Sequence, residues 1–218
     1  MNNRFCQIII FVLLAIQSLK AQTTNSYDLY SLGSTGGIIS ENRTISPLTD
    51  DGVKSVQLSA QQGDGVAWLK DILFSNGIIE LDIRGKNLVQ QSFVGIAFHG
   101  MKKDSLEAIY FRPFNFNSTD STRKSHAVEY VFHPDFPWER LRKENPGIYE
   151  KGIDPAPKPD YWFHVKIVVH YPEIKVYVNN SLTPSLTVQE LNSRQEGKIG
   201  LWVGNNSGGD FANLKISH

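Results

Sequence analysis

The sequence predicts an all-β protein, an antiparallel sandwich of about ten strands, and three observations lead to this fold class. Short runs of β-branched and aromatic residues recur along the chain, and turn residues separate them. The 3.6-residue periodicity of amphipathic helices is almost absent between the runs. Closely spaced strands without intervening helices are typical of antiparallel sandwiches.

The first residues are typical of a secretory signal peptide. Arg4 gives a short basic start, a mostly apolar run extends from Phe5 to Ile16, and Ala21 is a small residue of the kind that precedes a cleavage site. The run is shorter than the roughly 20 residues that a transmembrane helix needs, and a retained membrane anchor is the alternative. We expect residues 1–21 to be removed and residues 22–218 to form a single domain, exported to the periplasm or the extracellular space.

The composition excludes several kinds of site. Cys6 is the only cysteine and lies in the predicted signal peptide, so the mature chain would have no disulfide, thiolate nucleophile or cysteine-ligated metal. Lys plus Arg and Asp plus Glu number 22 each, so no net field favours nucleic acid or anionic membranes. A chain of this length can bury enough core to fold as one domain without disulfides. The oligomeric state stays open.

The strands are predicted from runs of alternating or continuous apolar residues between turn signals. They are residues 53–58, 66–69, 77–83, 92–99, 107–112, 126–132, 162–170, 173–179, 197–203 and 210–216. The run VVHYPEIKVYVN predicts a tight hairpin that turns at Tyr171-Pro172.

One long insertion interrupts this pattern. Six of the ten prolines lie within residues 133–161, which excludes a regular central strand there. Asp135 is expected to cap a short helix that ends near Asn145. Glu139 and Lys143 stand at i,i+4 in the favourable order for an ion pair. A long aromatic insertion on a β scaffold is commonly functional, and the alternative is a lid that closes the sandwich over its own core.

The segment YFRPFNF combines aromatic and polar side chains. Alternation along a strand directs Phe111 to the core and its neighbours Tyr110 and Arg112 to the opposite face. Pro113 then removes a donor and ends the ladder. We expect the face of Tyr110 and Arg112, together with Asn115, to border a ligand groove.

The segment GIIELDI places two carboxylates on one strand face. Glu80 and Asp82 lie roughly 7 Å apart along the strand, which suggests a glycosidase. This segment resembles the concanavalin A-like lectin/glucanase superfamily, whose family 16 glycoside hydrolases carry a further glutamate after such a pair. Here Arg84 or Gly85 stands at that position, and neither can protonate a leaving group. The family 16 mechanism is therefore not supported, and a solvated, salt-bridged face is the better interpretation.

Further segments follow the strand order of one branch of that superfamily. FSNGIIELDIRGKN, SFVGIAFHG, HAVEYVFHP, WFHVKIVV and GKIGLWVGNNSGGDFANLKI resemble the secreted bacterial 3-keto-disaccharide hydrolase-like domain, also described as a glycosyl hydrolase. The resemblance spans about 66–216 and implies a jelly-roll sandwich that meets carbohydrate on its concave sheet. Two departures concern the polar face. His99 replaces a typical arginine, and Glu129-Tyr130 reverses a Tyr-Glu pair.

Candidate site residues follow from the strand faces and from the chemistry of sugar recognition, which needs planar donors, acceptors and aromatic surface. Gly95, Ala97 and His99 share a face if their strand is regular. We expect Glu129 to be the acid/base, with His99 or His133 as the other proton-transfer group; a structural pairing of Glu129 with Arg112 is the alternative. The expected substrate-binding residues are Tyr110, Arg112, Asn115, His126, Trp138 and Arg142.

No metal or cofactor is expected. His126 and His133 fall on opposite faces of a regular strand, and no histidine pair shares an ion. The segments 50–52 and 205–210 could hold calcium through oxygens, but turns explain both more simply. The sequence thus favours an exported hydrolase that cleaves glycosidic bonds in sugars or modified sugars, with an oligosaccharide or polysaccharide as partner. The alternatives are a carbohydrate-binding protein that uses the same groove without chemistry, and a surface adhesion module that needs only the fold.

Overall fold

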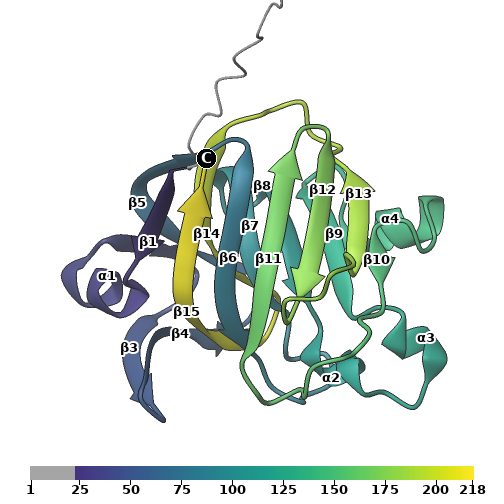
Figure 1. The fold of residues 1–218 in the computed structure, drawn as a ribbon, viewed down its shortest axis with the longest axis horizontal. Helices are drawn as coiled ribbons and strands as arrows, with labels where there is room; N and C mark the ends of the chain where they lie inside the picture. The colour runs from purple at the N-terminus through teal and green to yellow at the C-terminus, as the bar shows by residue number, and fades with distance from the viewer. Residues whose placement is uncertain (1–22) are drawn as a thin grey trace, which may run out of the picture.

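The computed structural model describes residues 23–218, which form two antiparallel β-sheets packed against each other (Figure 1). The predicted all-β sandwich is therefore confirmed. The predicted signal peptide lies outside the described residues. Within residues 23–218, none of the helices has the length and apolar character needed to cross a membrane.

The first sheet has eight strands. In spatial order they are β13 (Leu186–Gln189), β12 (Glu173–Val178), β11 (Phe163–His170), β6 (Gly77–Arg84), β15 (Ser207–Ser217), β4 (Val53–Gln61) and β3 (Ile45–Asp50), and β1 (Thr24–Tyr27) also pairs with β15.

The second sheet has seven strands. Their order is β10 (Glu150–Lys151), β9 (Val128–His133), β8 (Ser105–Phe111), β7 (Val94–Lys102), β14 (Gly197–Val203), β5 (Gly65–Phe74) and β2 (Ile38–Glu41). All ten predicted strands are present, most with shifts of one to three residues at their ends, whereas β5 runs to Phe74, five residues beyond the predicted end at Leu69. The predicted hairpin is confirmed, because β11 and β12 pair in register up to His170 opposite Glu173.

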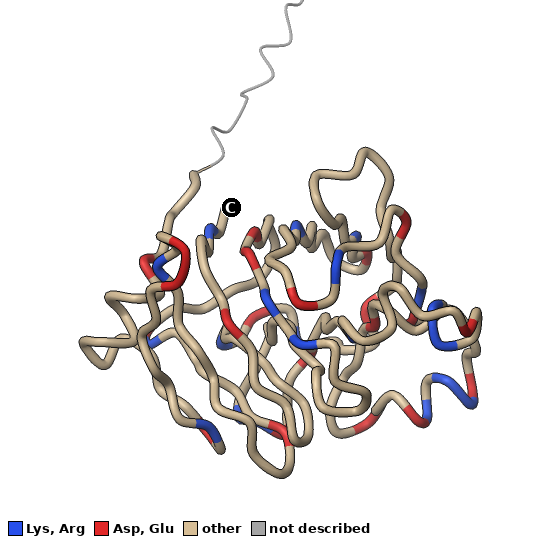
Figure 2. Tube along the Cα trace, turned by 90° about the horizontal axis from the view of Figure 1, so that it is seen from below, with Lys and Arg blue, Asp and Glu red and all other residues tan. Residues whose placement is uncertain are grey.

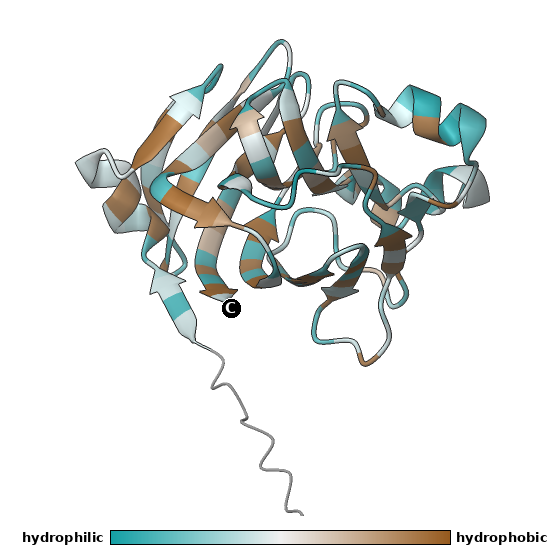
Figure 3. Cartoon of the chain, turned by 90° about the horizontal axis from the view of Figure 1, so that it is seen from above, coloured by the Kyte–Doolittle hydropathy of each residue, from teal (hydrophilic) through white to brown (hydrophobic). Residues whose placement is uncertain are grey.

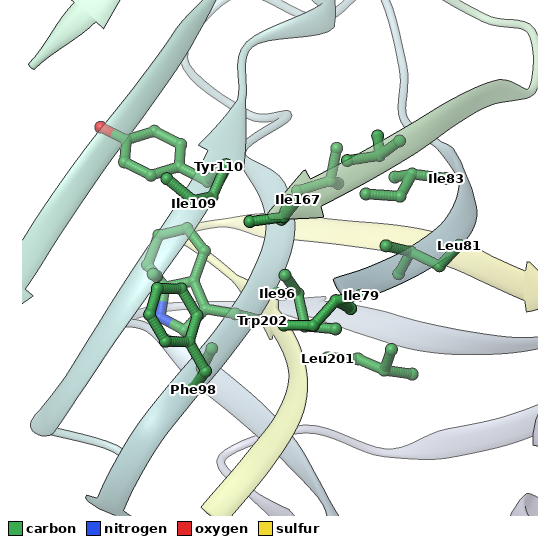
Figure 4. Close-up of a cluster of buried hydrophobic side chains, with 14 of the residues drawn as sticks. Ile79, Leu81, Ile83, Ile96, Phe98, Ile109, Tyr110, Ile167, Leu201 and Trp202 are labelled. Atoms are coloured by element: carbon green, nitrogen blue, oxygen red, sulfur yellow. The ribbon is translucent and has the colours of Figure 1, made fainter. Parts of the chain in front are cut away.

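The core lies between the two sheets and follows from alternation along their strands. Ile79, Leu81 and Ile83 of β6 are each 0% exposed, as their apolar positions in GIIELDI predict. Figure 4 shows these side chains facing Ile96 and Leu201 of the second sheet. Figure 3 shows the same pattern as hydrophobic and hydrophilic bands along the strands. Charges of both signs are interspersed along the chain, as the balanced composition predicts (Figure 2).

Four short helices complete the described chain: α1 (Leu29–Thr35), α2 (Pro113–Phe116), α3 (Ser121–Lys124) and α4 (Trp138–Glu144). The last is the helix expected in the insertion, but two details of that prediction are wrong. Pro137 rather than Asp135 is at the N-cap, where no side chain caps the helix. The i,i+4 pair joins Arg140 to Glu144, with Nε and Oε2 2.9 Å apart, in place of the expected pair one residue earlier.

The two ends of the described chain lie side by side at the edge of β15. Thr23 donates its backbone N–H to the carbonyl of His218 at 3.2 Å, and His218 donates to Thr23 at 3.0 Å. The pairing continues with Thr24 opposite Ser217 in β1 and β15. This pairing of the two ends belongs to the first sheet.

Candidate functional site

A row of side chains crosses the outer face of the second sheet. Trp202 of β14 lies opposite Gly95 of β7, and Gly95 lies opposite Tyr110 of β8. Tyr110 in turn lies opposite Glu129 of β9, which lies opposite Glu150 of β10. Residues directly opposite in neighbouring strands share a face. Alternation within single strands could not establish that these faces coincide, and the register shows that they do.

Gly95 is the one residue of this row without a side chain. A Cβ atom there would lie 2.1 Å from the backbone oxygen of Ile109 and 2.6 Å from Cα of Tyr110, so the close strand approach requires glycine. The rings of Tyr110 and Trp202 come from the two strands that flank β7, and their centroids are 5.1 Å apart. The small residue thus lets two aromatic side chains meet over the middle of the sheet.

The strand β8 divides its side chains as the sequence predicts. Ile109 and Phe111 are 0% exposed on the core side. Tyr110 and Arg112 point to the outer face, where the Arg112 guanidinium lies 4.9 Å from the centroid of the Tyr110 ring. Pro113 follows and begins α2, so the ladder ends where it was expected to end.

Arg112, Tyr110 and Glu129 form a buried polar cluster beneath the outer surface. Arg112 donates to the Tyr110 hydroxyl oxygen at 2.6 Å and also to Oε2 of Glu129, to which the Tyr110 hydroxyl donates at 2.9 Å. Burial raises the pKa of Glu129 and outweighs the opposing effect of Arg112. Burial also raises the pKa of Tyr110 well above its usual value. The pairing of Glu129 with Arg112, expected as the structural alternative, is present.

A second carboxylate, Glu150, is held beside the first. Arg142 donates to it through Nε at 2.8 Å and Nη2 at 2.6 Å, a bidentate pair. Burial alone would raise the pKa of Glu150, but the hydrogen bonds from Arg142 hold it below its usual value. Nδ1 of His126 lies 2.7 Å from Oε2 of Glu150. Burial lowers the pKa of His126, although Glu150 opposes this effect, so the ring is neutral at neutral pH.

Tyr110, Arg112, His126 and Arg142 border a cleft of about 850 Å³ on the outer face of the second sheet, and Glu129 and Glu150 lie behind them. Its aromatic walls are Phe93, Tyr110, Phe114, Trp138 and Trp202. The Phe93 and Phe114 rings meet edge to face with centroids 5.5 Å apart. The Arg142 guanidinium lies 4.7 Å from the centroid of the Trp138 ring, which fixes one side of the opening. A cleft with aromatic walls and a few convergent polar groups is typical of small-ligand sites.

The insertion lines this cleft with one face of α4 and packs into the core with another. Pro137, Trp138, Glu139 and Arg142 are at the cleft. Leu141 is 1% exposed and belongs to the core. The insertion therefore borders the cleft and also covers part of the core, so each of the two interpretations holds for one face of α4.

Seven of the nine predicted site residues lie together at the cleft: Tyr110, Arg112, Asn115, His126, His133, Trp138 and Arg142. His126 and His133 were expected on opposite faces, and this is wrong because His126 precedes β9, where strand alternation does not apply. Burial lowers the pKa of His133, and nearby Asp64 opposes the shift. Glu129 lies beneath the surface, 0% exposed.

His99 does not share the face of Gly95 and Ala97, so this expectation is wrong. The ladder between β7 and β8 is irregular between Phe98 and Lys102, and His99 has a φ of 46°. The side chain turns inward and lies 1% exposed beside the Phe74 ring, with ring centroids 5.9 Å apart. A bulge of this kind has no signal in the alternation of the sequence.

Three side chains that were not among the predicted site residues also line the cleft: Trp202, Phe93 and Arg123. Trp202 had a usable signal, because it alternates with the buried Leu201 in GKIGLWV and therefore faces outward. Phe93 had the same signal, because it lies in the predicted strand 92–99 and alternation places it on the face of Gly95. Arg123 lies in α3, where strand alternation gives no direction.

Glu80 and Asp82 lie on the other sheet, away from the cleft. Asp82 contacts Nδ1 of His164 at 2.8 Å, and Glu80 lies 3.7 Å from Nε2 of the same ring. This solvated, ion-paired face is the interpretation favoured over a family 16 site. Asp50 and Asp210, one from each segment considered for calcium, both form ion pairs with Arg84.

Solved structures share this fold at low sequence identity. The carbohydrate-binding module CBM66 from Bacillus subtilis superposes with a TM-score of 0.59 at 18% identity, covering 83% of this chain and 95% of its own. A Bacillus subtilis protein with a galectin-like fold gives a TM-score of 0.59 at 14% identity, covering 89% and 94%. The VIP36 exoplasmic/lumenal domain bound to Ca²⁺ and Man3GlcNAc gives 0.52 at 13%, covering 84% and 83%.

The family assignment rests on sequence. No curated protein matches the chain. Residues 21–217 match the sequence model of the 3-keto-alpha-glucoside-1,2-lyase-like domain, which confirms the resemblance seen in the order of the strand motifs. Because the match extends over almost all of the 218 residues, the chain belongs to the family of 3-keto-alpha-glucoside-1,2-lyase-like domains.

Proposed function

We propose that the protein binds a sugar or oxidised-sugar substrate in the cleft on the second sheet and cleaves a glycosidic bond there. The observation that carries this proposal is the cleft itself, where the aromatic walls surround a polar set of arginine and histidine side chains. Aromatic faces stack on sugar C–H groups while the polar groups bind hydroxyls. The family description and the glycan-binding relatives of the fold support a glycan as the ligand.

The name of the family describes an elimination across C1 and C2 of a 3-keto glucoside. In such a reaction the ketone acidifies the proton on C2, a base removes it, and the C1–O bond breaks as a proton reaches the leaving oxygen. His126 suits the base, because its pKa is lowered and Glu150 holds its Nδ1 side while the ring borders the cleft. Arg112 and Arg142 supply positive charge for the enolate oxygen. The proton that His126 takes from C2 can then pass to the leaving oxygen, while the ring of His133, whose pKa burial also lowers, borders the same cleft and suits a hydrogen bond to that oxygen.

The second candidate function is carbohydrate binding without catalysis. The burial of Glu129 favours it over the mechanism expected from the sequence, in which Glu129 was the acid/base, since a carboxylate that is 0% exposed and paired with Arg112 has no direct contact with a ligand in the cleft. In that case Tyr110, Arg112 and Trp138 would serve recognition alone. Both candidate functions assume that the protein is exported, which we infer from the signal-peptide pattern of residues 1–21.

A glycan panel separates these functions. The panel pairs α- and β-linked glucosides with their 3-keto derivatives and measures both binding by calorimetry and release of the leaving group. We expect turnover of 3-keto substrates and a loss of at least about 100-fold in His126→Gln, which corresponds to roughly 2.7 kcal/mol of barrier. Glu80→Gln is the matched control on the opposite sheet and should retain full activity. Binding without turnover would select the second candidate, and neither binding nor turnover would exclude both.

A further inference from the structure

A second polar cluster lies inside the sandwich, apart from the cleft. It consists of His99 at the bulge of β7, Glu107 of β8, and Glu190, which directly follows β13. One ligand atom from each residue lies within 4.8 Å of the others. The side chains of all three are at most 1% exposed. The cluster therefore joins the second sheet to the first across their shared interior.

The hydrogen bonds around His99 leave Nδ1 facing an acceptor. Nε2 lies 2.7 Å from the carbonyl oxygen of Ser75, which can only accept, so Nε2 carries the proton of a neutral ring. Nδ1 then offers a lone pair, yet it lies 3.0 Å from Oε1 of Glu107. Two acceptors at this separation need a proton or a cation between them.

Within residues 23–218 the only donor for this place is His99 itself, if its ring is protonated: burial lowers the pKa of His99, but the hydrogen bonds to Glu107 and Ser75 outweigh burial and raise it. The hydroxyl of Tyr130 donates to the other oxygen of Glu107, at 2.6 Å, and accepts from the backbone N–H of Leu191 at 3.0 Å. Both oxygens of Glu190 are buried without a hydrogen-bond partner among the described residues. Oε2 of Glu190 lies 3.7 Å from Nδ1 of His99, so the unpartnered carboxylate points into the cluster. An unsatisfied buried carboxylate is rare in folded proteins because it is costly.

We propose that His99, Glu107 and Glu190 bind a structural divalent metal ion of the zinc type through one imidazole nitrogen and two carboxylate oxygens. Tetrahedral ligands at zinc distances of 2.0–2.2 Å stand about 3.3 Å apart, and the separations of 3.0 and 3.7 Å from Nδ1 bracket that value. The bond from Nε2 to a backbone carbonyl and the Tyr130 bond to Glu107 are the outer contacts that orient such ligands.

The site would act as a cross-link in a mature chain that has no cysteine. Its ligands come from both sheets, so the bound ion would tie β7 and β8 to the end of β13 and oppose separation of the layers. Mixed imidazole and carboxylate ligands favour a transition metal over calcium. The alternative occupant is a proton, since burial and the charge of Glu107 raise the pKa of Glu190 to about 7.

Because the cluster is buried, the test starts from unfolded protein. The mature chain is unfolded in guanidinium with a chelator, dialysed, and refolded at pH 7.5 with Zn²⁺, Mn²⁺, Ca²⁺ or no metal. We expect one zinc per chain by mass spectrometry of the metal content. At a free Zn²⁺ concentration about 100 times Kd, the Tm should rise by roughly 5–10 °C over the metal-free protein.

Glu190→Gln keeps the size of the side chain and should abolish both the stoichiometric zinc and the rise in Tm, whereas the control Glu80→Gln keeps both. Wild-type protein that refolds without metal to the same Tm, and takes up no zinc, overturns the proposal and leaves a shared proton as the occupant. Zinc retained by Glu190→Gln also overturns it, since the ion would then sit elsewhere. The wild-type titration decides the question even if the variant does not fold.

Discussion

Tyr110 and Glu129 lie directly opposite each other in β8 and β9, and the Tyr110 hydroxyl donates a 2.9 Å hydrogen bond to Oε2 of Glu129. Arg112 donates to the same carboxylate oxygen. The partners leave almost no exposed surface, with Glu129 at 0% and Arg112 at 5%. Removing one partner of a buried ion pair lowers stability by more than the intact pair contributes, because the remaining charge stays buried and unpaired. The contact thus has consequences for stability as well as for the cleft.

Replacing Arg112 with alanine leaves Glu129 buried without its hydrogen-bonded cation, because the remaining arginine, Arg142, lies 4.0 Å away from Oε2. We expect Arg112→Ala to lower the free energy of unfolding by about 3–5 kcal/mol, measured by chemical denaturation. Arg123→Ala is the matched control, because Arg123 also lines the cleft but is partly exposed and its hydrogen bond to Asn115 is 3.4 Å long. It should change stability by no more than about 0.5 kcal/mol. Equal midpoints for wild type and Arg112→Ala would contradict the prediction.

Phe111 tests the face assignment of the same strand from the core side. Its ring is 0% exposed and meets Phe163 of the other sheet with centroids 5.2 Å apart. Phe111→Ala should cost about 3–5 kcal/mol of stability through lost burial and a cavity. Leu182→Ala, at a residue 98% exposed, should leave the thermal melt unchanged. A Phe111→Ala melt close to wild type would mean that the strand faces are inverted.

The strands that were predicted from the sequence differ from those that were not in their position within the sheets. The ten predicted strands bury long apolar runs, and none of them ends a sheet. The missed strands β13 and β3 end the first sheet and β10 and β2 end the second, while β1 pairs only with β15. Edge strands bury less and tolerate proline, as Pro47 in β3 illustrates. Their sequences therefore carry a weaker periodic signal.

The site residues could be predicted where they lie on regular strands, because alternation there tells which face of the sheet each side chain occupies. Tyr110 and Arg112 follow from the strand period, and Trp202 could have been found in the same way. His99 could not, since a bulge with positive φ reverses its side chain without changing the pattern of residues. The partners of Glu129 and Glu150 depend on the order of strands in the sheet, which a single sequence does not give.

Trp138 tests the role of the insertion. It is 39% exposed, lines the cleft and stacks on Arg142. Trp138→Ala should weaken glycan binding about tenfold, or roughly 1.4 kcal/mol by calorimetry, and change the Tm little. Tyr161→Ala is the control, an aromatic residue 62% exposed that does not line the cleft. If Trp138→Ala keeps full affinity but melts earlier, α4 serves the core rather than the ligand.

The neutral state of His126 predicts the acid side of any pH–rate profile. Burial lowers the pKa of His126 from 6.5, so the folded protein keeps the ring unprotonated to lower pH than the unfolded chain does. Its contribution to stability is present above pH 6.5 and is lost as the pH falls through the lowered pKa. We expect kcat/KM to fall only below pH 6.5 and His126→Gln to lose this dependence. An acid limb that is unchanged in the variant would assign the base to another residue.

The first residue of the recovered protein tests whether a signal peptide is removed and the protein exported. The basic start, apolar run and small residue of the first segment predict cleavage after Ala21. Mass spectrometry of protein recovered from outside the cytoplasm should find Gln22 as the first residue. Recovery of a chain that still carries Met1 would instead support the membrane-anchor alternative.

The hydrogen bonds between Thr23 and His218 bring the two ends of the described segment together, so residues 23–218 form nearly a closed ring. The strand pairing of this segment therefore does not depend on where the ring is opened. A circular permutant of residues 23–218 that joins His218 to Thr23 through a short glycine–serine linker and opens at Leu182 keeps every strand pairing and breaks only the exposed link between β12 and β13. New ends there lie beside β13 at the edge of the first sheet, so a fused partner can be attached without touching the strands that form the cleft floor.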